Sequence, residues 1–285
     1  MNTAPPHRPR ILFVTDLAYQ AKGRRYCDED IHLTARLRED FDVALCHPLD
    51  AAPLMETGAF DTVVVRNSGP VIGYQEQWDD FTRRAAACGA RVYNQLTGRA
   101  DQVGKRYLLD LTAAGYPVIP TVDDPRDVDR LPETETYVVK PQLGADSIGL
   151  EFVDAEGLSA LTPDADSSGI LIQPCVDFTY EVSFYFVDRS FQYALHAPDP
   201  AERWRLERYV PTAADLSFAQ RFVDWNTIEH GIQRVDACRT RGGELLLVEL
   251  EDLNPYLSLD LLDEETRESF VTAMKTSLRR RLAGR

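Results

Sequence analysis

The chain has 285 residues and carries 46 acidic against 31 basic side chains, which gives a formal net charge of −15. This acidic balance disfavours non-specific binding to nucleic acid or to anionic membranes, because both require clustered Lys and Arg. A chain of 285 residues exceeds the usual size of a single core, so two or three packed units are expected. A local basic pocket for a small anionic ligand is still compatible with the overall charge.

Cysteine usage and hydropathy point to a cytoplasmic protein. The cysteines lie far apart, at Cys27, Cys46, Cys88, Cys175 and Cys238. An odd, unclustered set is typical of reduced thiols. The first ten residues are polar and proline-rich, and no apolar run approaches the roughly 18 residues of a membrane span. We therefore expect neither a signal peptide nor a membrane segment.

Apolar runs and helical patterns alternate over about the first 95 residues. Strands are predicted at 11–16, 43–46, 62–66 and 91–93, and helices at 28–39 and 75–88. This alternation is typical of a parallel α/β unit. Ligands of such units bind at the carboxyl ends of the strands, where the sequence places Asp16, the basic loop 22–25 and Arg66.

The rest of the chain mixes short strands, hairpins and helices. Helices are predicted at 101–115, 213–230 and 263–283, short strands at 118–119, 138–139 and 170–174, and hairpins at 182–195 and 232–251. Gly115 and Pro117 are typical of the end of the first of these helices. Strands and helices are therefore expected throughout the chain, with no repeat.

A short apolar strand, residues 137–141, ends in Lys140 and is followed by a loop that contains Gly144 and Gly149. A strand holds the ammonium group in place, and glycines let backbone N–H groups approach phosphate oxygens. The segment therefore indicates a phosphate-binding site. Taken alone, Lys140 is equally consistent with an edge-strand lysine that prevents aggregation, and the glycines with an ordinary turn. Lys105, taken alone, is typical of a surface residue on a helix.

Three carboxylates are expected to converge on the predicted hairpin 232–251. With its turn centred on Gly242, Asp236 faces position 248, within one residue of Glu249. Glu249 and Glu251 are two residues apart on a strand, so they share a face. Clustered carboxylates repel one another unless a cation lies among them, and hard oxygen ligands suit Mg²⁺. The alternative is the solvated end of an ordinary hairpin.

Other cofactor motifs are missing from the sequence. No G-x-G-x-x-G run is present, and no group of Cys and His has the spacing of a zinc site or of a nucleophile with its base. The loop after Lys140 is not a Walker A loop, because Gly149 is followed by Leu150 and Glu151. Dinucleotide, zinc and cysteine-nucleophile chemistry are therefore disfavoured.

The order of these features carries a family resemblance. The α/β unit is followed by the run 101–108 with Lys105, by Lys140 and its loop, by the run 171–177, and by Asp236, Glu249, Glu251 and Asn254. This order resembles the ATP-grasp superfamily of carboxylate–amine ligases, in the glutathione-synthetase-like branch. Within that branch it is similar to small amino-acid ligases of bacterial natural-product pathways, including the cycloserine-forming type. The resemblance covers nearly the whole chain from about residue 10.

The resemblance implies an α/β and α+β fold in three parts. Residues 1–98 would form an N-terminal parallel α/β (pre-ATP-grasp) substrate domain, residues 99–175 the small ATP-grasp lobe, and residues 176–285 the C-terminal lobe with the metal site. The two α+β lobes would clamp ATP between them.

The resemblance also implies the residues that bind ATP. Lys105 and Lys140 would hold the α- and β-phosphates. The 144–149 loop would cover the phosphates through Gly144, Ala145, Asp146 and Ser147. Backbone groups of Gln173, Cys175 and Val176 would line the adenine, and Asp177 would contact the ribose.

The remaining implied roles concern metal, catalysis and substrate. Asp236, Glu249 and Glu251 would hold Mg²⁺. Arg205 and Arg234 would neutralise the γ-phosphate and the acyl phosphate, and Arg66 would bind the substrate. For the ammonium group of an amino-acid substrate we consider Asp16, Glu29 and Asp30, although such acids are more often helix N-terminal charges.

Two positions depart from the family pattern. The last metal position is commonly Asn in a Glu-x-Asn motif, but here it is Glu251, and Asn254 follows three residues later. Asn254 could therefore be a metal ligand, a substrate contact or neither. The usual Arg-Pro-Gly is replaced by residues 254–258, near the expected acceptor site.

From these features we expect an ATP- and Mg²⁺-dependent ligase that joins amino acids into a dipeptide or γ-glutamyl amide through an acyl phosphate. Its substrates would be small molecules rather than nucleic acid or membrane, and a homodimer is one option for its assembly. The alternatives are a ligase that closes a ring on one substrate, a non-catalytic nucleotide-binding module, and a sugar- or nucleotide-modifying α/β enzyme.

Overall fold

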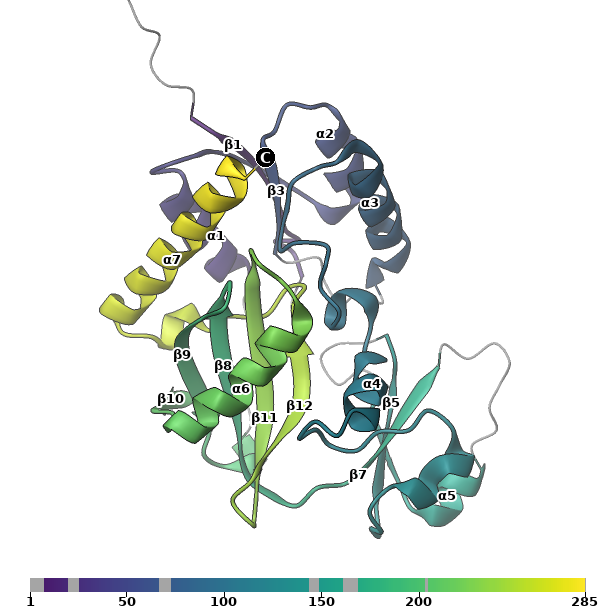
Figure 1. Cartoon of the computed structure of the whole chain (residues 1–285). Helices are drawn as coiled ribbons and strands as arrows, with labels where there is room; N and C mark the ends of the chain where they lie inside the picture. The colour runs from purple at the N-terminus through teal and green to yellow at the C-terminus, as the bar shows by residue number, and fades with distance from the viewer. Residues whose placement is uncertain are drawn as a thin grey trace, which may run out of the picture.

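The computed structural model describes residues 8–19, 26–66, 73–143, 149–160, 169–202 and 205–284. Three sheets organise these residues: a parallel sheet of order β2-β1-β3-β4, a sheet of order β6-β5-β7, and a sheet of order β10-β9-β8-β11-β12 (Figure 1). The expected mixture of α/β and α+β architecture is thereby confirmed. Within the described ranges, no helix has the length and apolar character needed to cross a membrane.

The N-terminal sheet matches the predicted α/β unit. Its strands are β1 (Arg10–Val14), β2 (Asp42–Cys46), β3 (Thr62–Val65) and β4 (Val92–Tyr93), all parallel. Its helices are α1 (Tyr26–Leu37), α2 (Ala51–Glu56) and α3 (Gln75–Cys88). Val14 lies opposite both Cys46 and Val65, so the carboxyl ends of β1, β2 and β3 meet at one edge.

Both faces of this sheet are covered, because side chains alternate along a strand. Ile11 and Phe13 pack with α1 and with the C-terminal helix α7 (Glu264–Ala283). Leu12 and Val14 pack on the opposite face with α2 and α3. In Figure 1, α7 crosses from the C-terminal sheet to the face of β1 that α1 also covers. The end of the chain therefore ties the N-terminal unit to the C-terminal sheet.

The C-terminal sheet is antiparallel and contains both predicted hairpins. Its strands are β8 (Phe178–Val187), β9 (Ser190–Ala197), β10 (Glu207–Tyr209), β11 (Ile232–Thr240) and β12 (Leu245–Glu251). Helix α6 (Ala213–Asn226) packs on one face through Ala219, Phe222 and Val223, which are fully buried. The prediction of a helix to residue 230 is wrong at its end, because Thr227 adopts a left-handed φ of 65° and stops α6.

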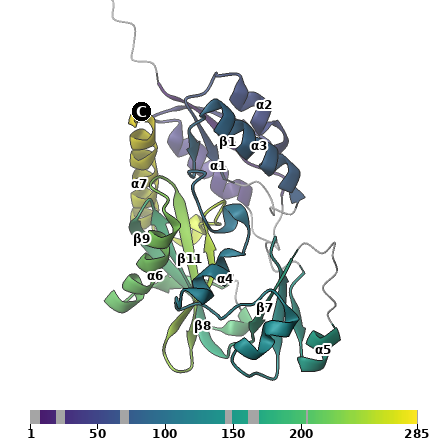
Figure 2. The same ribbon diagram turned by 45° about the vertical axis from the view of Figure 1, so that its right-hand side comes forward.

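The smaller sheet lies beside the C-terminal sheet (Figure 2). It comprises β5 (Tyr137–Pro141), β6 (Glu151–Val153) and β7 (Ile170–Pro174), with the short helix α5 (Ala155–Ala160) following β6. Lys140 lies opposite Leu171 on β7. The sequence pattern predicted β5 and β7 but missed β6, α5, α2 and β10, which are too short to show a periodicity.

The prediction of a single helix over residues 101–115 is wrong, because the helix is interrupted in the middle of this range. The structure has a 3-10 turn at Asp101–Val103 and then the helix α4 (Tyr107–Ala113). Gly104 separates them with a φ of 86°, a conformation that favours glycine. The break turns the backbone N–H of Lys105 toward Gln142 O, to which it donates at 2.8 Å. Lys105 is thereby brought beside the strand that carries Lys140.

We predict that the packing of α6 contributes strongly to stability. Phe222→Ala should lower the free energy of unfolding by about 3–5 kcal/mol, because it leaves a cavity in a fully buried site. Urea unfolding followed by circular dichroism measures the loss. Phe152→Ala is the matched control, since Phe152 is 65% exposed, and it should change stability by less than about 0.5 kcal/mol. Equal effects of the two changes would contradict the packing described.

Candidate active site

The register of β11 and β12 brings acidic and basic side chains face to face. Asp236 lies opposite Glu249, and Arg234 lies opposite Glu251, with a bulge between Asp236 and Ala237. The predicted partner of Asp236, position 248, was therefore one residue off, and the bulge accounts for the shift. The observed pairing of Asp236 with Glu249 confirms that these two carboxylates lie close together, as expected.

Arg234 is almost buried and bridges two of these carboxylates. Its Nε donates to Asp236 Oδ1 at 2.9 Å and its Nη2 to Asp236 Oδ2 at 2.8 Å, while Nη2 also donates to Glu251 Oε1. Its Nη1 donates to the carbonyl of Tyr256 at 2.9 Å. Desolvation opposes the charge of Arg234, but the carboxylates of Asp236 and Glu251 outweigh it and raise the pKa of Arg234. The guanidinium is therefore permanently charged and fixed in orientation.

Three carboxylates could hold a divalent cation. Among the residues that the structure describes, oxygens of Asp101, Glu249 and Glu251 lie within 4.8 Å of one another. Burial raises the pKa of Glu251 to about 7, although Arg234 opposes the shift. A set of carboxylate oxygens this close suits Mg²⁺ or Mn²⁺. The donor set therefore fits the metal that the sequence predicts, with Asp101 in the cluster and Asp236 held by Arg234.

Two lysines lie beside these carboxylates. Lys105, which is 7% exposed, places its Nζ against Glu249 Oε1 and 3.7 Å from Asp101 Oδ1. Burial and the ammonium group of Lys105 lower the pKa of Lys140 to about 7, with Asp101 acting in the opposite direction. Two ammonium groups that repel each other gain stability when a polyanion binds between them. The arrangement is suited to a phosphate chain that meets a metal site.

The other residues expected to bind nucleotide lie on or after β7. Gln173 is buried and donates through Nε2 to Thr121 Oγ1 at 2.8 Å, and the backbone N–H of Cys175 donates to Thr136 O at 2.9 Å. Val176 is half-buried and Asp177 is exposed. The Asp177 carboxylate pairs with Arg241 Nε at 3.1 Å. Their contacts with adenine and ribose stay predictions.

Some expected residues do not join the cluster or lie outside the described ranges. Gly144, Ala145, Asp146 and Ser147 lie outside the described residues. Arg205 is exposed and pairs with Glu202 at 3.3 Å. Its proposed action on the γ-phosphate stays a prediction.

Arg66 is buried at the junction of the N-terminal unit and the chain after β12. Its Nη2 donates to Glu29 Oε1 at 2.8 Å, its Nε lies 3.4 Å from Asp30 Oδ1, and its Nη1 donates to Pro255 O at 3.0 Å. Glu29 also accepts from the backbone N–H of Leu257 at 3.0 Å. The arginine expected to bind a substrate carboxylate therefore pairs with Glu29 and Asp30, two of the three acids considered for an ammonium group.

Asp16 and Asn254 have contacts of their own. Asp16 accepts a hydrogen bond from the Tyr74 hydroxyl at 2.7 Å and from the backbone N–H of Ala18 at 2.9 Å. Asn254 is half-buried, three residues beyond Glu251, in the chain segment that Arg66 contacts. Substrate binding by Arg66 and Asn254 stays a prediction.

A buried polar network, missed in the sequence, supports the cluster. The Asp252 carboxylate is fully buried and accepts from the backbone N–H groups of Ala100 at 3.2 Å and Gln102 at 2.8 Å. Asn226 Nδ2 donates to the same carboxylate at 3.1 Å. These bonds hold the segment that carries Asp101 against the end of β12. The sequence carries no local signal for this role of Asp252, because its partner Gln102 lies 150 residues away in the chain.

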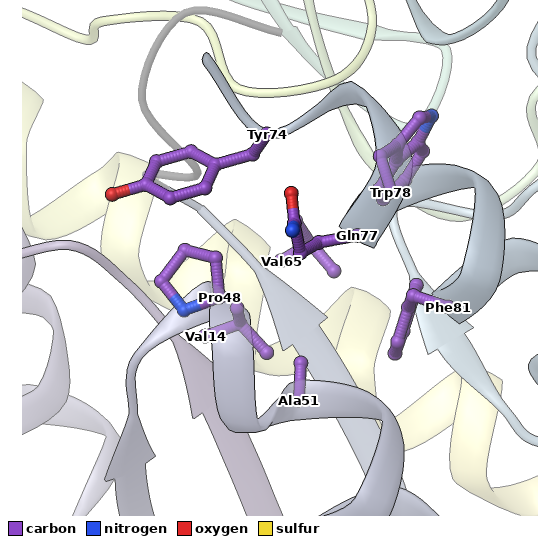
Figure 3. A pocket seen from close by; sticks show the side chains of 8 residues that line it. All are labelled: Val14, Pro48, Ala51, Val65, Tyr74, Gln77, Trp78 and Phe81. Atoms are coloured by element: carbon purple, nitrogen blue, oxygen red, sulfur yellow. The ribbon is translucent and has the colours of Figure 1, made fainter.

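Residues that the structure describes line a cleft and a small cavity near the N-terminal unit. A cleft of about 450 Å³ runs between α3 and the turn at 102–104, with Leu143 on its wall. A second, apolar cavity of about 20 Å³ lies between β1, β3 and α3, and Figure 3 shows the ring of Tyr74 at one side of it, across from Trp78 and Phe81. The second cavity has room for about one water-sized group. The larger cleft is the one that reaches the segment next to Lys105.

Comparison with solved structures identifies the fold. D-cycloserine synthetase DcsG matches with a TM-score of 0.73 and 21% identity, covering 96% of this chain and 99% of that chain. D-alanine–D-alanine ligase from Bacillus anthracis matches with a TM-score of 0.67 and 15% identity, covering 96% and 98%. The ATP-grasp ligase PsnB, complexed with a precursor variant, Mg and ADP, matches with a TM-score of 0.63 and 16% identity, covering 95% and 99%.

These likenesses extend over nearly all of the chain, and they confirm the predicted ATP-grasp fold. No protein-family model matches the sequence, and no curated protein matches it significantly.

We predict that Arg66 is required for folding stability. Arg66→Ala should lower the free energy of unfolding by about 3–5 kcal/mol, because Glu29 and Asp30 would be left buried without their cation. Chemical unfolding measures this loss, and Arg38→Ala, at an exposed position, is the control that should stay within about 0.5 kcal/mol of the wild type. An Arg66→Ala protein as stable as the control would show that the guanidinium is available to a ligand.

Proposed function

We propose that this protein is an ATP- and Mg²⁺-dependent amino-acid ligase that forms an amide through an acyl phosphate. The observation that carries the proposal is the meeting of Lys105 and the carboxylate of Glu249 between the two antiparallel sheets of an ATP-grasp fold. D-alanine–D-alanine ligase from Bacillus anthracis has been described in complex with ATP, and PsnB with Mg and ADP. The chemistry of the side chains here is consistent with the same cofactors.

The physical problem is that a free carboxylate does not acylate an amine in water, since oxide is a very poor leaving group. An oxygen of the substrate carboxylate attacks the γ-phosphorus of ATP, the bond from that phosphorus to the β–γ bridging oxygen breaks, and ADP leaves. The amine nitrogen then attacks the acyl carbon, phosphate leaves, and the nitrogen loses a proton. Positioning and electrostatic stabilisation supply most of the catalysis in such a reaction.

The residues divide this task by charge. Lys105 and Lys140 would bind the phosphates, and Glu249 and Glu251 would hold the metal ion, which neutralises charge on the transferring phosphoryl group. Arg234, fixed by Asp236 and Glu251, would stabilise the acyl phosphate. Arg205 would have to move toward the phosphates to assist it, since in this structure it pairs with Glu202. The 144–149 loop would exclude water.

The proposal includes three parts with distinct tasks. Residues 1–98 would bind substrate, residues 99–175 would form the small lobe, and residues 176–285 the lobe with the metal site. We further propose that the enzyme acts in the cytoplasm on small amino-acid substrates, with a homodimer as one option for its assembly. The 450 Å³ cleft beside the turn at 102–104 would be a route by which a substrate reaches Lys105.

Ring closure on a single substrate is the second candidate. It is favoured by the TM-score of 0.73 with D-cycloserine synthetase, which exceeds the 0.67 with D-alanine–D-alanine ligase. The mass of the product separates the two reactions: two substrates minus one water indicates coupling, and one substrate minus one water indicates cyclisation.

We predict that ADP release depends on both an amino-acid substrate and Mg²⁺. A screen of amino acids, singly and in pairs, should identify substrates that stimulate ADP release. Glu249→Gln should lower the rate by about a hundredfold or more while the protein stays folded, because the change removes a charge needed by the metal. Glu244→Gln, at an exposed position of the same hairpin, should have little effect. ATP binding without any substrate-dependent turnover would instead support a nucleotide-binding module.

We also predict that ATP affinity depends on pH through Lys140. The pKa of this lysine is lowered to about 7, so in the free protein its ammonium group is lost as the pH rises above neutrality. Phosphate binds the charged form, so affinity should fall by up to about tenfold per pH unit above pH 7. Calorimetric titration with ATP from pH 6 to 9 measures this slope in the wild type and in Lys140→Met. The ionisation of ATP affects both proteins equally, whereas only the wild type has the lysine. Identical pH dependence of the ATP affinity in the two proteins would contradict the role of Lys140.

A further inference from the structure

Asp101 is a carboxylate of the cluster that the family pattern of Asp236, Glu249 and Glu251 does not include. Its Oδ1 is completely buried and accepts no hydrogen bond from the residues that the structure describes. A carboxylate oxygen buried in this way is costly unless a cation lies nearby. One of its oxygens lies within 4.8 Å of oxygens of both Glu249 and Glu251. Asp101 Oδ1 therefore has unused hydrogen-bond capacity beside the other two carboxylates, with Lys105 Nζ as its ion-pair partner at 3.7 Å.

The position of Asp101 is fixed by the backbone on both sides of it. The N–H groups of Ala100 and Gln102 both donate to the buried carboxylate of Asp252, at 3.2 and 2.8 Å. Asp252 directly follows Glu251 at the end of β12, so the two acidic segments are joined by hydrogen bonds. The glycine turn at Gly104 then redirects the chain toward β5. The hydrogen bonds of the flanking backbone therefore fix the position of Asp101 at the cluster.

The position between these carboxylates accepts a cation in the structure itself. Lys105 Nζ contacts Glu249 Oε1 and lies 3.7 Å from Asp101 Oδ1. Asp236, in contrast, receives two hydrogen bonds from Nε and one from Nη2 of Arg234, at 2.9, 3.1 and 2.8 Å. Arg234 also contacts Glu251, but through one nitrogen alone, so Asp236 is the carboxylate that the guanidinium engages most fully. Asp101 instead shares Lys105 with Glu249.

We propose that Asp101 is a ligand of the divalent-cation site together with Glu249 and Glu251, and that Lys105 competes with the metal ion for these carboxylates. The proposal rests on the proposed function, because it concerns the site that would hold Mg²⁺ there. Counted with Asp236 and Arg234, the cluster has four carboxylates against the cations of Arg234 and Lys105. The remaining negative charge is neutralised better by a divalent ion than by a lysine. Binding of phosphate by Lys105 would withdraw its ammonium group and free the carboxylates for the metal, which couples the two ligands.

The test measures metal binding directly, without turnover. Mn²⁺ is titrated into the full-length protein in the absence of nucleotide, and the free ion is followed by electron paramagnetic resonance. Asp101→Asn should weaken Mn²⁺ binding by about tenfold or more, in the same direction as Glu249→Gln. Asp129→Asn is the matched control: it removes the same charge at an exposed position and should leave the affinity unchanged. Circular dichroism and the unfolding midpoint of each variant establish that it is folded.

A second variant keeps the proposal falsifiable if Asp101→Asn does not fold. Lys105→Met retains all three carboxylates and removes the competing ammonium group, so it should raise Mn²⁺ affinity at least severalfold. Unchanged affinity in a folded Asp101→Asn protein, or no gain in Lys105→Met, would overturn the proposal. If Glu249→Gln alone weakens binding, Asp101 is not a ligand and the proposed function stands. If none of these changes affects Mn²⁺, both are overturned.

Discussion

Four carboxylates lie close together at the β11–β12 hairpin and the turn before Lys105, where they are largely shielded from water. Their mutual repulsion is the main physical constraint on this part of the molecule. Asp236 and Glu251 are compensated by Arg234, and Glu249 and Asp101 by Lys105. Removing one of these cations would leave half-buried carboxylates that repel each other, which disfavours their close approach. The alternation of charges depends on the register of β11 and β12 and on the bulge after Asp236, which sets which residues face one another.

The chain after β12 connects this charged centre to the rest of the molecule. Asp252 holds the turn before Lys105, and Pro255 and Leu257 bind the Arg66–Glu29 pair of the N-terminal unit. Tyr193 of β9 donates to the carbonyl of Leu257 at 2.7 Å. The segment 252–257 is therefore hydrogen-bonded to the N-terminal unit and to the C-terminal sheet. Through Asp252 it is also bonded to the turn that precedes Lys105. Relative motion of these parts would change the metal site and the expected acceptor site together.

Periodicity and turn residues were sufficient to predict the long elements and the hairpin of the candidate site. The glycines after Arg241 place Asp236 near Glu249 because hairpin pairing is local in sequence. Asp101 and Asp252 could not be found in this way, since their roles depend on contacts about 150 residues apart in the chain. Arg66 was predicted to bind substrate, but its ion pair with Glu29 was not predicted. A single arginine at the end of a strand is equally compatible with binding a ligand and with a buried ion pair.

The central claim is that these charges form the site of a nucleotide and its divalent cation. Crystals grown with Mn²⁺ and a non-hydrolysable ATP analogue, measured at the manganese absorption edge, test it most directly. The account predicts an anomalous peak within about 2.2 Å of carboxylate oxygens of Glu249 and Glu251, with the phosphates against Lys105 and Lys140. A nucleotide bound elsewhere, or a peak distant from both glutamates, would contradict it.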